Sequence, residues 1–141
     1  MSSNGKTDLT YLSPDGWFSL AYPSTWEFDN EENCTSFFKQ YEGVGALQIS
    51  AYQADTDQHA YDILTEYLRD NGIGAGTTLE HSNERQEAAA AEFENATSFT
   101  RIWIITRGFY LVFVTYVCEP SSREVEISEV REIVRSIQVA V

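Results

Sequence analysis

The side chains that could perform catalysis in this sequence are few, and they form no recognisable motif. The chain has two histidines, His59 and His81, and two cysteines, Cys34 and Cys118. None of the four has a Cys or His neighbour at the spacing of a zinc site. Cys34 falls in a polar segment, whereas Cys118 ends an apolar one, where a cysteine typically packs as a small hydrophobic residue. A Cys–His nucleophilic pair stays open, because such partners converge only in space.

Carboxylates are abundant, and their presence alone therefore indicates no acid–base chemistry. The acidic segment 29–33 reads Asp-Asn-Glu-Glu-Asn, without the alternating ligands and central glycine of an EF-hand loop. No serine sits in a Gly-x-Ser-x-Gly elbow. We predict no metal site, no cofactor and no enzymatic activity. A small hydrolase that uses dispersed carboxylates or Cys34 is kept as an alternative.

The charge of the chain restricts its partners. Nine basic and 22 acidic residues give a net charge of −13 over 141 residues. This balance opposes binding to nucleic acid or to an anionic membrane, and it suits either a basic protein partner or simple solubility. No apolar run is long enough to span a bilayer, and the polar N-terminus lacks the apolar core of a secretory signal. We expect a cytoplasmic protein, unless a signal has been removed.

Strands account for most of the predicted structure. Phe18, Leu20 and Tyr22 alternate with smaller residues, which predicts a strand that ends at Pro23. A second strand is expected to begin at Trp26, so that the two strands form an opening unit. Further strands are predicted at residues 35–41, 46–53, 77–81, 86–93, 98–106 and 109–118.

Two segments change to the three-to-four-residue period of an amphipathic helix. The first covers residues 57–71, where Asp55 or Asp57 is expected to cap the start and Gly72 to end the helix. The second is the C-terminal helix, for which Ser121 and Glu124 are expected to form a capping box. Its apolar stripe consists of Ile127, Val130, Ile133, Val134 and Ile137.

These elements define the predicted fold class. The strands at 98–106 and 109–118 are apolar on both faces, which favours a sheet covered on both sides. We predict an α+β domain, an α/β/α sandwich with a largely antiparallel sheet of six or seven strands and two main helices. A single domain is expected over 1–141, with 1–10 as a flexible N-terminal segment.

Three segments, taken with the order of elements, resemble the PsbP-like superfamily. They are Phe-Ser-Leu-Ala-Tyr-Pro-Ser-Thr-Trp at 18–26, the hairpin 102–117 and the closing Ile-Val-Arg-Ser-Ile at 133–137. The superfamily includes the extrinsic photosystem II subunit PsbP, nuclear-import factors that bind the small GTPase Ran, and bacterial families of unknown function. A bacterial family of unknown function is the nearest match. The resemblance implies a scaffold that acts through protein contacts rather than catalysis.

We therefore predict a non-catalytic protein-binding module, such as a bacterial adaptor or an immunity-type protein that engages a basic partner. A domain that binds a small apolar ligand between sheet and helix is a further alternative, and the oligomeric state is left open. Trp17 and Trp26 are more typical of core packing, but they would anchor an interface if exposed beside Tyr22, Tyr41 or Tyr52. The candidate contact residues are Trp17, Trp26, Glu27, Asp29, Glu31 and Glu32. The four acidic ones are a loose counterpart of the acidic surface of the Ran-binding members.

Overall fold

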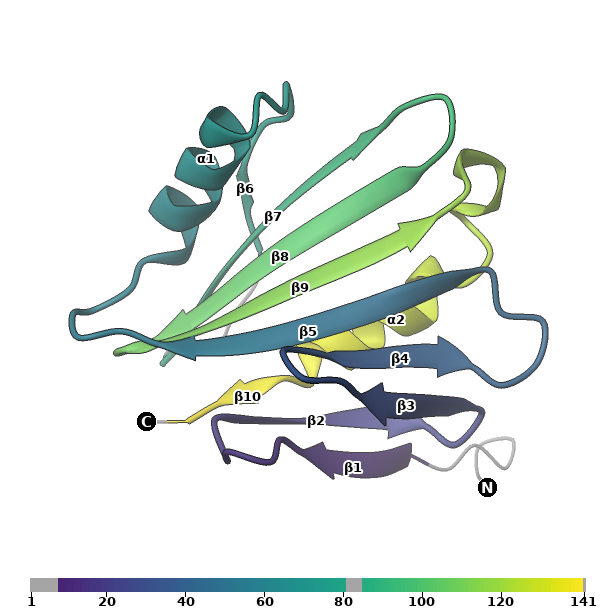
Figure 1. Cartoon of the computed structure of the whole chain (residues 1–141), viewed down its shortest axis with the longest axis horizontal. Helices are drawn as coiled ribbons and strands as arrows, with labels where there is room; N and C mark the ends of the chain where they lie inside the picture. Colours follow the sequence, from purple (N-terminus) through teal and green to yellow (C-terminus); the bar gives the residue numbers. More distant parts are fainter. Residues whose placement is uncertain (1–7, 81–84, 141) are drawn as a thin grey trace.

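The larger of two sheets has seven antiparallel strands in the order β3-β4-β5-β9-β8-β7-β6 (Figure 1). The computed structural model describes residues 8–80 and 85–140. The sheet and two helices confirm the predicted α+β class and the strand number. The strands are β3 (Trp26–Asn30), β4 (Thr35–Lys39), β5 (Gly45–Gln53), β6 (Thr78–Leu79), β7 (Glu87–Glu94), β8 (Phe99–Arg107) and β9 (Tyr110–Cys118).

A second, three-stranded sheet was not predicted. It has the order β1-β2-β10 and consists of β1 (Asp8–Leu12), β2 (Phe18–Pro23) and β10 (Gln138–Val139). The predicted opening unit is therefore divided, because β2 belongs to this sheet and β3 is the edge of the larger one. Residues 8–10, expected to be part of a flexible segment, pair with β2 instead. Residues 1–7 lie outside the described part of the chain.

Helix α1 (Ala60–Asp70) covers one face of β7 and β8 (Figure 1). Its Leu64 and Leu68 pack against small alanine side chains of β7 and isoleucines of β8. Capping by Asp55 or Asp57 is wrong, since the Ala60 N–H donates to the Glu87 carboxylate at 3.1 Å and no side chain caps the helix from its own segment. A strand of the sheet thus supplies the acceptor that we expected from the local sequence.

The end of α1 agrees with the prediction. Gly72 has φ +66°, the left-handed conformation that glycine adopts without steric cost. The Gly72 N–H donates to the Arg69 carbonyl at 3.1 Å, and the Ile73 N–H to the Leu68 carbonyl at 2.9 Å. These two bonds form a Schellman motif, which satisfies carbonyls that the helix leaves open.

Helix α2 (Ile127–Arg135) and the small sheet cover the opposite face of the large sheet (Figure 1). The predicted capping box is wrong, because Ser121 lies in a short 3-10 helix (Pro120–Ser122) and α2 begins only after Glu126. The Glu126 carboxylate is buried against β5 and β9, and this tertiary contact coincides with the start of the helix. Among the helices that the structure describes, none is long and apolar enough to cross a membrane.

Candidate functional site

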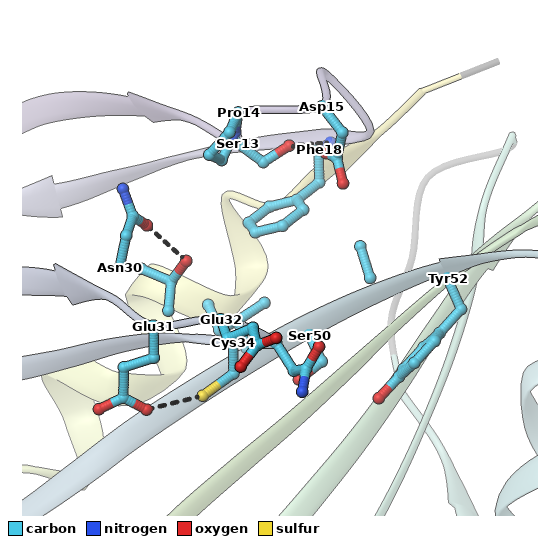
Figure 2. Close-up of a pocket in the computed structure, with 14 residues that line it drawn as sticks. Ser13, Pro14, Asp15, Phe18, Asn30, Glu31, Glu32, Cys34, Ser50 and Tyr52 are labelled. Atoms are coloured by element: carbon cyan, nitrogen blue, oxygen red, sulfur yellow. Dashed lines mark hydrogen bonds between the residues drawn. The ribbon is translucent and has the colours of Figure 1, made fainter.

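A cleft of about 640 Å³ opens between the two sheets, near the tip of the β3–β4 hairpin (Figure 2). Residues 13–15 and Phe18 from the small sheet line one side, residues 30–35 of the hairpin line another, and residues 49–52 of β5 complete the wall. The volume lies within the range of about 300–1,000 Å³ that is common for ligand sites.

The turn between β1 and β2 holds one carboxylate at the rim. The Ser13 hydroxyl donates to Asp15 Oδ1 at 2.7 Å, and it accepts from the N–H groups of Trp17 at 3.0 Å and Phe18 at 3.2 Å. The same Asp15 oxygen accepts from the Trp17 N–H at 3.1 Å. Gly16 has φ +76°, which allows the chain to reverse there. These bonds fix the Asp15 carboxylate beside the cleft.

The tip of the β3–β4 hairpin supplies the other two rim carboxylates, Glu31 and Glu32. The Glu31 N–H donates to the Cys34 carbonyl at 2.8 Å, and the Cys34 thiol donates back to Glu31 Oε1 at 3.2 Å. At the base of the tip, Asn30 Oδ1 accepts from the Tyr11 hydroxyl at 2.7 Å and from the Thr35 hydroxyl at 2.9 Å. Hydrogen bonds thus connect the residues of the hairpin tip to one another and connect the base of the tip to β1 of the small sheet.

The floor of the cleft is apolar. Phe18 and Ile49 are buried, and Ala51 is half-buried beside them, whereas Tyr52 is 54% exposed at one side. Figure 2 shows Phe18 pointing from the small sheet into the space between the Asp15 turn and the hairpin tip. Within residues 8–80 and 85–140, the charged residues that line the cleft are all acidic, so the electrostatic potential there favours a cationic group.

The structure separates the six predicted contact residues. Glu31 and Glu32 line the cleft together with Asp15, which sequence analysis missed. Glu27 and Asp29 are exposed on the edge strand β3, outside the residues lining the cleft. A Pro-Asp-Gly turn was readable at 14–16, but its position opposite the hairpin tip was not.

The two tryptophans pack rather than project. Trp26 is 1% exposed within the main core, which confirms the core interpretation and leaves it no face for a partner. Trp17 is half-buried, with its ring centroid 5.7 Å from that of Tyr110. Among the tyrosines considered as interface residues, Tyr22 is buried, whereas Tyr41 and Tyr52 are exposed.

The residues considered for catalysis are not brought together within the described ranges. His59 Nδ1 lies 3.3 Å from Glu87 Oε2, and His59 is not among the residues lining the cleft that contains Cys34. His81 lies outside the described residues. Cys118 is buried at the end of β9. No group of three or more His, Cys, Asp or Glu residues that could hold a metal ion occurs in residues 8–80 and 85–140.

The environment of Cys34 disfavours its thiolate. Burial raises the pKa of this thiol first, and the hydrogen bond to Glu31 and the Glu31 charge raise it further. A raised pKa means a smaller thiolate fraction at neutral pH, and the thiolate is the nucleophilic form.

We therefore expect iodoacetamide to alkylate Cys34 at pH 8 several-fold more slowly than an unperturbed cysteine in a peptide. Glu31→Gln removes the negative charge and is expected to accelerate the reaction by roughly threefold. The measurement is the alkylation rate of the Cys34 peptide by mass spectrometry, with Glu66→Gln on α1 as a matched control. A rate for wild-type Cys34 above that of the peptide would contradict the assignment.

Comparison with known proteins identifies the fold and then the family. A solution structure of cyanobacterial PsbP (CyanoP) from Synechocystis sp. PCC 6803 matches with a TM-score of 0.67 at 14% identity, over 99% of this chain and 98% of that one. This confirms the PsbP-like fold. The chain belongs to the family described as Domain of unknown function (DUF3805), whose model matches residues 6–141.

A crystal structure from Bacteroides thetaiotaomicron VPI-5482 is also similar, with a TM-score of 0.69 and 22% identity. The match covers 99% of this chain and 50% of that chain, so this chain spans half the length of that protein. No curated protein matches the sequence.

Proposed function

We propose that this protein is a non-catalytic binding module that engages a basic protein partner at the acidic cleft. The observation that carries the proposal is the composition of the cleft: Asp15, Glu31 and Glu32 form its rim, and none of the lining residues in the described part of the chain is basic. The net charge of −13 extends the same preference beyond the cleft. Such a field speeds the encounter with a basic partner and orients it.

The apolar floor complements the charged rim. Exposed charge pairs contribute little affinity by themselves, whereas burial of apolar area contributes most of it. Phe18 and Ile49 are core residues that support the cleft from below, so the accessible apolar contacts are the half-buried Ala51 and the exposed ring of Tyr52, the kind of residue that is common at interface hot spots. A partner segment with basic and apolar side chains fits this arrangement.

The setting we propose is a bacterial cytoplasm, with an adaptor or an immunity-type protein as the concrete form. Both of the similar solved structures described above come from bacteria, which supports the first part. Both cysteines are unpaired, as is usual in a reducing compartment.

A small-ligand site is a second candidate, because the cleft volume is in the range for small molecules. The acidic rim would restrict such a ligand to a cation. A hydrolase based on Cys34 is less well supported, since burial and Glu31 raise the pKa of its thiol.

The proposal predicts that neutralising the rim weakens partner binding. We expect D15N/E31Q/E32Q to bind the partner roughly 30-fold more weakly at low salt, at about 0.5–1 kcal/mol for each charge. The partner is identified by mass spectrometry after a salt-graded pulldown from the source cell, and its affinity is then measured by calorimetry.

The matched control is D62N/E66Q/E132Q, which removes the same number of carboxylates from exposed positions on α1 and α2. Both variants change the net charge from −13 to −10, that is −13 plus 3. Equal affinity of the two variants would show that overall charge, and not the cleft, attracts the partner. Binding that is insensitive to salt would refute electrostatic recognition.

A further inference from the structure

Strand β5 continues past the point where its neighbour β4 begins, and this leaves an unpaired strand edge in the cleft. The β4–β5 pairing runs from Phe37↔Leu47 to Thr35↔Ile49, whereas β9 pairs with β5 along its whole length. Within the described part of the chain, residues 50–53 have no strand partner on the β4 side. Figure 1 shows this end of β5 extending beyond β4.

The polar groups at this edge follow from strand geometry. The Ala54 N–H donates to the Phe109 carbonyl at 2.8 Å, so the Ala54 backbone points toward β9. Hydrogen-bonding direction alternates along an antiparallel strand, so Ser50 and Tyr52 also point toward β9. Ala51 and Gln53 therefore direct their N–H and C=O groups to the unpaired side. Backbone N–H and C=O groups are strong hydrogen-bonding groups, so these are available to pair with a further strand.

Residues 50–52 of the unpaired edge line the same cleft as the acidic rim, and Gln53 follows them outside its lining. Ser50, Ala51 and Tyr52 line the cleft together with the hairpin tip and the Asp15 turn (Figure 2). A chain segment placed along this edge would continue the line of β4. Its side chains would alternate between the two faces of the sheet, toward the apolar Phe18 on one side and toward solvent beside Tyr52 on the other.

We propose that the partner binds by β-strand addition, as an extended segment that pairs with residues 50–53 of β5 and carries lysine or arginine for the rim. This inference rests on the proposed function, because the site and the basic partner are the same. Main-chain hydrogen bonds to Ala51 and Gln53 supply affinity, and the rim carboxylates select the basic sequence.

The negative charge of the rim favours a basic partner over a second copy of this chain as the segment that pairs with β5. Two copies joined at this edge would bring two sets of Asp15, Glu31 and Glu32 close together, and like charges across an interface are unfavourable. A basic strand instead neutralises the rim. Self-association through this edge is therefore an outcome that would contradict the proposal.

The test uses a nonapeptide in which lysine alternates with valine as the probe. Two N-methylated forms of the peptide serve as controls. One is methylated at every even-numbered amide and the other at every odd-numbered amide. Each form keeps the charge of the peptide but loses the N–H donors on one side of the strand. We expect one of them to bind the full-length protein about tenfold more weakly than the parent peptide, because it loses the bonds to Ala51 and Gln53. The parent peptide is also expected to slow amide hydrogen exchange at Ala51 and Gln53, as observed by NMR.

A backbone variant provides an independent readout. Gln53→Pro removes one edge N–H near the end of β5, where proline is tolerated if that N–H faces outward. Gln53→Ala is the matched control, since both variants lose the side-chain bond to the Tyr110 hydroxyl and only the proline removes the donor. We expect about tenfold weaker peptide binding for Gln53→Pro and an unchanged affinity for Gln53→Ala. The hydrogen-exchange measurement on the wild type does not depend on whether the proline variant folds.

The outcomes separate the two proposals. If the three peptides bind equally, without slower exchange at Ala51 and Gln53, but D15N/E31Q/E32Q weakens binding, strand addition is refuted and the basic-partner proposal stands. If the lysine peptide does not bind at millimolar concentration, or a glutamate version binds equally well, both proposals fail. Dimerisation of the protein with exchange slowed at the same two amides would replace the basic partner by a second copy.

Discussion

Replacing Trp26 by alanine is expected to lower the free energy of unfolding by about 4 kcal/mol. The side chain is 1% exposed and belongs to the core between the large sheet, the small sheet and α2. Its Nε1 lies 3.4 Å from Glu129 Oε2 on α2, and the same carboxylate pairs with Lys39 at 2.9 Å. Trp26 thus connects the edge strand β3 to α2, and its loss leaves a cavity in the core. Urea denaturation followed by circular dichroism measures the change.

The matched comparison is Trp17→Ala, which removes the same side chain from a half-buried position. Its ring contacts Tyr110 at a centroid distance of 5.7 Å, and we expect a loss of about 1–2 kcal/mol. Equal losses for the two variants would refute the core assignment of Trp26. A Trp26→Phe variant that stays folded is expected to bind the lysine peptide with wild-type affinity, because Trp26 does not line the cleft.

The apolar patterns within individual strands made most of the large sheet predictable. The hairpin at 98–118 carries apolar residues on both faces, and the structure places its strands in the middle of the sheet, between β5 and β7. The division between β2 and β3 was not readable, since both strands alternate equally well and sheet membership depends on which edge each strand reaches. Strand β10 has two residues, too few for a periodic pattern. Its pairing with β2 is decided by tertiary contacts.

The acidic part of the candidate site could be predicted, but its shape could not. Glu31 and Glu32 stood out because they form a local acidic segment. Asp15 is distant in sequence from that segment, and it joins the rim only because the small sheet packs over the large one. The unpaired edge of β5 depends on the stagger between β4 and β5. No local pattern encodes stagger, because pairing register is a property of two strands together.

The second large effect is expected at Glu126, a buried carboxylate at the start of α2. Its Oε1 accepts from the Tyr116 hydroxyl at 2.8 Å and from the Gly45 N–H at 3.1 Å. Glu126→Ala would leave both buried donors without an acceptor, and we expect the free energy of unfolding to fall by about 3 kcal/mol. The absence of a side chain at Gly45 permits this contact, since a Cβ there would lie 2.7 Å from the Tyr116 hydroxyl oxygen.

Glu126→Gln keeps a hydrogen-bond acceptor at this position but removes the carboxylate. The amide oxygen can still accept from Tyr116 and Gly45, and the NH₂ group replaces Oε2, which has no hydrogen-bond partner in the structure. Burial, followed by the hydrogen bond and charge of Glu126, raises the pKa of the Tyr116 phenol, so this hydroxyl remains a donor at neutral pH. The NH₂ group also brings two donors to this buried position, so we expect Glu126→Gln to lower the free energy of unfolding by about 1–2 kcal/mol, less than Glu126→Ala. A loss as large as that of the alanine variant in urea denaturation would show that keeping the acceptor for Tyr116 and Gly45 does not preserve stability.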